Sequence, residues 1–91
     1  MNIEKHLVES ADIHAITEYM NELGWSITDL HRHTIISVAS LHDILSGMIH
    51  PTYGQLMHII NKIILHFPQD RHWEIYHTIM IKPITEGKNN D

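Results

Sequence analysis

The apolar residues of this 91-residue chain recur at spacings of three and four, which is the period of an α-helix. One stripe lies between Ser10 and Gly24, and the widest apolar face follows Thr52. The two sets are Ile13, Ile16, Met20 and Leu23, and then Leu56, Ile59, Ile60, Ile63 and Ile64. This pattern predicts an all-α fold, with a first long helix that Ser10 or Asp12 opens and Gly24 ends.

Hydroxyl residues and glycine divide the middle of the chain into short helices. Ser26, followed three residues later by Asp29, can cap one helix. Ser37 can cap a second helix, which should stop at Gly47, because glycine takes the left-handed conformation after a helix at little cost. Only residues 34–36 separate these two helices. A connection that short predicts the sharp crossing of a helix-turn-helix.

The last third of the chain predicts two more helices. Thr52 and Gln55 form the T-x-x-Q capping box, which satisfies two unpaired amides at a helix start. This helix should end before Phe67, because the residue before a proline is pushed away from helical geometry. A final helix from about residue 69 to residue 81 would present an apolar face. The face consists of Trp73, Tyr76, Ile79 and Met80.

The two ends of the chain carry weaker patterns. Ile3, Leu7 and Val8 fit either a short helix or an irregular arm, and we expect the short helix. Residues 84–91 are polar and should form a flexible tail. We therefore expect a single domain over residues 1–83, built as a compact bundle of about five helices.

Residues 24–63 resemble the lambda-repressor-like (Cro/cI, Xre) DNA-binding domain and can be laid on its pattern without a gap. The matching buried, capping and turn positions are Leu30, Ser37, Leu41, Gly47, Pro51, Leu56, Ile59 and Ile63. The resemblance implies a helix-turn-helix at residues 26–46 in a small, sequence-specific, DNA-binding transcriptional regulator.

Some positions depart from the pattern of that family. His31 stands where the family usually has a small alanine, and Ile35 stands where it usually has the turn glycine. Val38, Ala39 and Asp43 fill places where arginine, glutamine or lysine often read bases.

The second helix of such a motif places its N-terminal residues against base edges in the major groove. Ser37, Ser40 and His42 are the polar side chains there, and hydroxyl and imidazole groups can hydrogen-bond bases. Thr28 and His50 could hold phosphates on either side. These five residues are the candidate contacts with double-stranded DNA.

Trp73 and Tyr76 admit two interpretations. They could close the core of the bundle, or they could form the surface of a homodimer. A dimer would place two recognition helices one DNA turn apart, about 34 Å.

Charge supports an alternative function. The chain carries −5 with neutral histidines, and residues 24–63 are neutral, whereas a DNA-binding protein usually has a basic patch. The alternative is a degenerate helix-turn-helix domain that binds or inhibits a protein partner. Exposed apolar side chains at Ile27, Ile35 or Val38 would favour it, since clustered surface hydrophobes mark protein contacts.

Histidine is abundant, with ten residues. No two of them stand three or four residues apart, the spacing that lets one helix face hold a metal ion, so we expect no metal or cofactor. A site assembled between helices stays open. Protonation of all ten would move the formal charge from −5 to +5. Any affinity for DNA should therefore rise as the pH falls from about 8 to 6.

Other classes of protein are disfavoured. The chain has no cysteine, so it forms neither disulfides nor thiolate metal sites. No apolar run approaches the ~18 residues that span a bilayer, and the first residues lack the core of a signal peptide. We expect a cytoplasmic protein without a membrane partner. Motifs of nucleophilic and metal-dependent catalysis are missing too, so we expect no enzyme.

Overall fold

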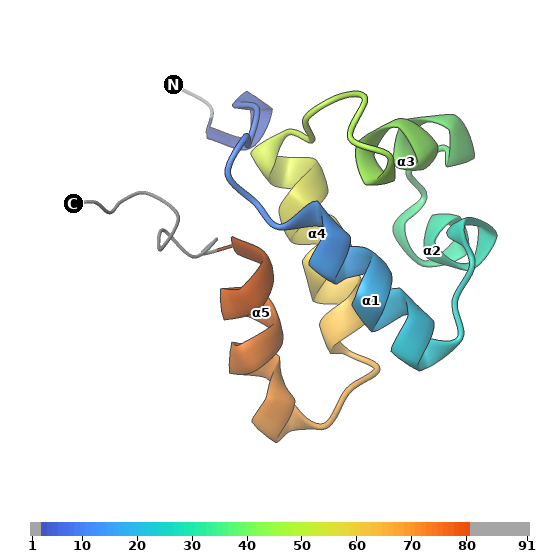
Figure 1. The fold of residues 1–91 in the computed structure, drawn as a ribbon, viewed down its shortest axis with the longest axis vertical. Coiled ribbons are helices and arrows are strands. Elements are labelled where there is room, and N and C mark those ends of the chain that lie inside the picture. The colour runs from blue at the N-terminus through green and yellow to red at the C-terminus, as the bar shows by residue number, and fades with distance from the viewer. Residues whose placement is uncertain (1–2, 81–91) are drawn as a thin grey trace.

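Five α-helices follow one another within residues 3–80, the part of the chain that the computed structural model describes (Figure 1). They are α1 (Ile13–Leu23), α2 (Ile27–Thr34), α3 (Val38–Leu45), α4 (Tyr53–Ile64) and α5 (His72–Met80), with short 3-10 helices at Ile3–Lys5 and Gln69–Arg71. These residues contain no strand, which confirms the all-α prediction. None of these helices is long and apolar enough to cross a membrane. The predicted tail lies outside the described residues.

The predicted caps of α1 and α2 are present. The carboxylate of Asp12 accepts a hydrogen bond from the backbone N–H of Ala15 at 3.2 Å, and Gly24 ends α1 with a φ of 74°. At α2, the N–H of Asp29 donates to Ser26 Oγ at 3.2 Å, and the N–H of Ser26 donates to Asp29 Oδ2 at 2.8 Å. The single cap of α1 and the capping box of α2 satisfy amides that a helix start otherwise leaves unpaired.

The predicted boundaries of α3 and α4 also hold. Ser37 Oγ accepts from the N–H of Ser40 at 3.1 Å, and Gly47 follows the helix with a φ of 83°. Thr52 and Gln55 form the reciprocal pair of hydrogen bonds at 3.0 and 3.1 Å. Short-range side-chain chemistry thus sets where each of these helices begins.

Helix α4 crosses the middle of the molecule, and α1, α2 and α5 pack against it (Figure 1). Helix α3 packs on α1 and α2 at the edge of the bundle. The core consists of side chains with no accessible surface from all five helices. They are Ile16, Leu30, Leu41, Ile44, Leu56, Ile59, Ile60, Ile63, Ile75 and Ile79.

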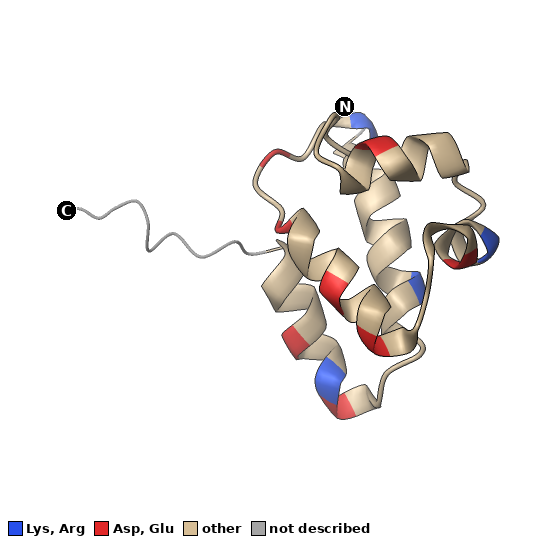
Figure 2. Ribbon diagram, turned by 45° about the vertical axis from the view of Figure 1, so that its right-hand side comes forward, with Lys and Arg blue, Asp and Glu red and all other residues tan. Residues whose placement is uncertain are grey.

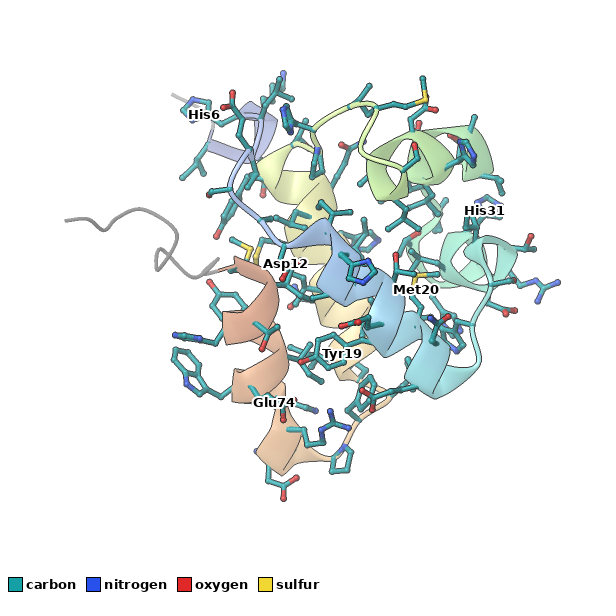
Figure 3. All side chains as sticks on the ribbon, in the orientation of Figure 1. His6, Asp12, Tyr19, Met20, His31 and Glu74 are labelled. Atoms are coloured by element: carbon teal, nitrogen blue, oxygen red, sulfur yellow. The ribbon has the colours of Figure 1, made fainter. Side chains whose placement is uncertain are left out.

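A polar network joins α1 to the C-terminal helices. Tyr19 and Glu74 face each other between α1 and α5, and the Tyr19 hydroxyl donates to the Glu74 carboxylate at 3.2 Å (Figure 3). Arg71 bridges Glu22 at 2.9 Å and Glu74 at 3.2 Å, and its guanidinium lies 4.9 Å from the ring of Phe67. Arg71 holds the pKa of the Glu74 carboxyl below its usual range.

The predicted apolar face of α5 was partly wrong. Ile75 and Ile79 are fully buried, whereas Trp73 is 69% exposed. Tyr76 and Met80 are half-buried against the core. The reason is helical phase, since Trp73 lies two residues before Ile75 and so points to the opposite side of the helix.

Of the short helix that we expected at the N-terminus, the structure has only one 3-10 turn at Ile3–Lys5, and the residues after it form an irregular arm. After one 3-10 turn, the N–H of Val8 donates to the carbonyl of Pro51 at 2.8 Å, and the N–H of Tyr53 donates to the carbonyl of His6 at 2.7 Å. Ile3 and Leu7 are exposed, so no apolar stripe forms. The arm prevails over a helix because it satisfies an otherwise unpaired amide in the first turn of α4.

Candidate nucleic-acid interface

Helices α2 and α3 form a pair joined by three residues, and α3 stands at the edge of the molecule (Figure 1). Leu41 and Ile44 anchor α3 with no accessible surface. Val38, Ala39 and His42 lie on its exposed side. The helix therefore presents one free face along its whole length.

The turn between the two helices contains an unusual backbone conformation. Ile35 has a φ of 65°, the left-handed region, and its side chain is 85% exposed. This conformation costs roughly 1–2 kcal/mol for a residue with a Cβ atom, and a β-branched residue adopts it rarely. Ile35 thus occupies a glycine-type position without the benefit of burial.

Two histidines hold this turn in place. His31 Nδ1 lies 2.7 Å from the carbonyl oxygen of Ile36, and His58 Nε2 lies 2.8 Å from the carbonyl oxygen of Thr34. Because a carbonyl oxygen only accepts, each of these ring nitrogens must carry the proton. Figure 3 places His31 between α2 and α3. His31 therefore ties α2 to the turn.

The hydroxyls at the start of α3 bond to each other. Ser37 Oγ caps the helix and also donates to Ser40 Oγ at 3.0 Å. The hydrogen of the Ser40 hydroxyl remains available to an outside acceptor. His42 is exposed, with Nδ1 3.6 Å from a carboxylate oxygen of Asp43. Ser40 and His42 are thus the groups on α3 that can meet a ligand.

The structure brings the other two predicted contacts to the surface. Thr28 is exposed in the first turn of α2, and His50 is exposed in the segment after α3. Within residues 3–80, neither side chain makes a hydrogen bond or an ion pair.

Positive charge is sparse on this face. Figure 2 shows no lysine or arginine on α3, whose one charged residue is Asp43. Arg32 on α2 pairs with Asp29 at 3.1 Å. Hydrogen bonds from the Ser26 backbone and hydroxyl, with the nearby charge of Arg32, lower the pKa of Asp29. The charge of Arg32 is therefore largely offset at neutral pH.

An open pocket of about 360 Å³ lies beside α3, between the end of α1 and the start of α2. Apolar side chains form most of its wall, and hydroxyl, amide and imidazole groups complete it. The lining residues are Thr17, Met20, Asn21, Trp25, Ser26, Ile27, His42, Leu45 and Ser46. Because Ile27 packs here against the core, it is not one of the exposed apolar residues.

Two groups of aromatic rings lie outside α3, one on α5 and one around Trp25, which also lines this pocket. On α5, the ring of exposed Trp73 lies 6.0 Å from that of Tyr76 and 5.5 Å from that of His77. Next to α2, Trp25 stacks on His33 at 4.3 Å, and His66 contacts both rings. The second group could not be predicted from local spacing, because His66 follows α4 whereas Trp25 and His33 belong to the stretch around α2.

Within residues 3–80, no group of three or more histidine and carboxylate side chains is arranged to hold a metal ion. Comparison of the chain with protein-family models, with curated proteins and with solved structures finds no match.

Proposed function

We propose that this chain is a small, sequence-specific DNA-binding protein that regulates transcription, with α3 as the recognition helix of a Cro/cI-like helix-turn-helix. The observation that carries the proposal is the uncovered face of α3, which stands at the edge of the bundle after a three-residue turn (Figure 1). An α-helix exposed in this way fits the major groove of B-form DNA.

The exposed groups of α3 suit a particular kind of readout. Val38 and Ala39 offer methyl groups that can contact the methyl of thymine. The hydroxyl of Ser40 and the imidazole of His42 can hydrogen-bond base edges, while Thr28 can hold a phosphate. Because none of these is an arginine, few phosphates are neutralised. The dependence of affinity on salt should then be shallow, with a slope of about −0.9 for each phosphate contact.

A dimer would compensate for weak contacts in each half-site. We place its interface at Trp73 and Tyr76 on α5. The exposure of Trp73 supports this placement over a role in the core, since aromatic residues are enriched at protein interfaces.

Selection from a pool of random duplex DNA at about 50 mM salt tests the function, because electrostatic binding is strongest at low salt. The protein should enrich a common sequence, and more strongly at pH 6 than at pH 8. The double variant Ser40→Ala/His42→Ala should lose this enrichment. The matched variant Ser10→Ala/His14→Ala removes the same two side chains near the start of α1 and should retain it. Equal enrichment by both variants, or no retention of DNA at either pH, would refute DNA reading by α3.

A second candidate function is binding of a protein partner through the turn. Ile35 and Val38 are 85% and 43% exposed, and Ile35 adopts a strained conformation as well. Strain and exposed apolar surface at one place are typical of an interaction site. The double variant Ile35→Ser/Val38→Ser separates the two functions. If the protein binds a partner protein through the turn, this variant should no longer bind that partner. If the protein binds DNA through α3, the variant should lose only the contact of Val38 with thymine.

A further inference from the structure

We propose that His33 and His66 together bind a divalent transition-metal ion of the class that prefers imidazole ligands. His33 lies in the last turn of α2, and His66 lies two residues past the end of α4. Their ring centroids are 4.9 Å apart, with the ring planes inclined at 72°. The tertiary structure thus makes a histidine pair that no helical spacing in the sequence supplies.

The separation of the two rings suits a shared ion. A metal–nitrogen distance of about 2.0–2.1 Å and a tetrahedral angle at the metal place two imidazole centroids roughly 5 Å apart. The observed separation of 4.9 Å is close to this value.

The ring nitrogens of this pair are free. Across residues 3–80, neither His33 nor His66 makes a hydrogen bond or an ion pair. By contrast, His31, His58 and His72 each use one ring nitrogen on a backbone carbonyl. Both side chains of the pair are also exposed, so an ion can reach them and water can fill its remaining coordination positions.

Trp25 organises the site before an ion arrives. Its ring stacks on His33 at 4.3 Å with an interplanar angle of 7°, and it meets His66 edge-on at 4.8 Å. Trp25 itself packs against the core. A side chain held in this way loses less conformational freedom on binding. Asp29 lies one helical turn before His33, and its carboxylate interacts electrostatically with the His33 side chain. The same carboxylate would offset part of the charge of a bound ion.

A bound ion would join α2 to the end of α4. The site uses none of the proposed DNA contacts, and it goes beyond the proposed function. Imidazole ligands favour Cu²⁺, Ni²⁺ and Zn²⁺ over Mg²⁺ and Ca²⁺, which require oxygen ligands.

Fluorescence of Trp25 tests the site without DNA. We would use the full chain carrying Trp73→Phe, so that Trp25 is the only tryptophan, and titrate it with Cu²⁺, which quenches indole on contact. The emission should fall to a plateau at one ion per chain. In this background, His33→Gln and His66→Gln should each weaken the apparent affinity by about 10-fold or more. His14→Gln removes an exposed histidine of α1 and should change nothing, as should titration with Mg²⁺.

Zn²⁺ provides a second readout that does not depend on quenching. An ion that binds only the folded protein raises its melting temperature, and the increase should disappear in both glutamine variants. Comparison of each variant with and without Zn²⁺ removes any effect of the substitution on the fold itself. The site would be overturned if quenching and thermal shifts were the same in the parent and in both variants. It would also be overturned if quenching reached no plateau below about 1 mM Cu²⁺, because a paired imidazole site should bind the ion more tightly than that.

Discussion

Replacement of Ile35 by glycine should stabilise the protein, although it removes a large apolar side chain. Ile35 is the one non-glycine residue within residues 3–80 with a positive φ, 65°. Glycine adopts this conformation without a steric penalty. The substitution therefore removes strain from the turn between α2 and α3.

Three contributions set the magnitude. Relief of the left-handed conformation gains roughly 1–2 kcal/mol. The greater freedom of glycine in the unfolded chain costs roughly 0.5–1 kcal/mol. Because the side chain is 85% exposed, its lost burial is only a small part of the ~1.5–3 kcal/mol of a fully buried isoleucine, about 0.3 kcal/mol. The net gain is about 0.5 kcal/mol, or roughly 2–4 °C in melting temperature for a domain of this size.

Thermal and urea unfolding monitored by circular dichroism would measure this effect. Two control variants isolate the cause. Ile35→Ala retains a Cβ atom and the conformational penalty, so it should not gain stability. Ile36→Gly changes the next residue, which has an ordinary φ and packs against the core, and it should lose stability. If Ile35→Gly melts at or below the temperature of the parent protein, the strain argument is wrong.

Three further predictions concern stability. Thr52→Ala removes the hydroxyl that accepts from the N–H of Gln55 at 3.1 Å and should cost about 1 kcal/mol in urea unfolding, and no measurable loss would show that the cap is dispensable. Ile60→Ala opens a cavity at a site with no accessible surface and should cost about 2–5 kcal/mol at an unchanged denaturant m-value, whereas a loss below about 1 kcal/mol would contradict tight packing there. Asp29 has a pKa below its ordinary 3.8 in the folded protein, so its carboxylate stabilises the fold above that pH and the effect fades as the pH falls through the folded value. Melting curves of Asp29→Asn should therefore differ from the parent at pH 7 and converge with it as the pH falls below the folded pKa of Asp29, and a constant gap would refute this linkage.

Local chemistry made the helix boundaries predictable. The caps at Ser26, Ser37 and Thr52 depend on groups within three residues of each other, so their signals are complete in a short stretch of sequence. Features that depend on packing were not predictable in this way. Whether Trp73 or Ile75 faces the core depends on how α5 is rotated about its axis against α1 and α4. The sequence does not decide this rotation, because apolar residues lie on both sides of the helix.

In the candidate interface, too, local features were predictable and features that depend on tertiary packing were not. The position of α3 followed from its cap and the short turn, and the exposure of His42 followed from helical period. The tie between His31 and Ile36 could not be read from spacing, nor could the meeting of His33 and His66, because each depends on how the chain folds back. The assignment to the lambda-repressor-like family and the DNA contacts themselves stay predictions.

The N-terminal arm has a mechanical consequence. Its hydrogen bonds end on Pro51 and Tyr53, at the junction where the segment that follows α3 enters α4. Force applied at the start of the chain, for example by a fused protein, would therefore load this junction before it reached the core. A tether attached there would pull on the end of the connection that leaves α3, whereas a tether attached within α5 would load a helix that packs on α1 and α4.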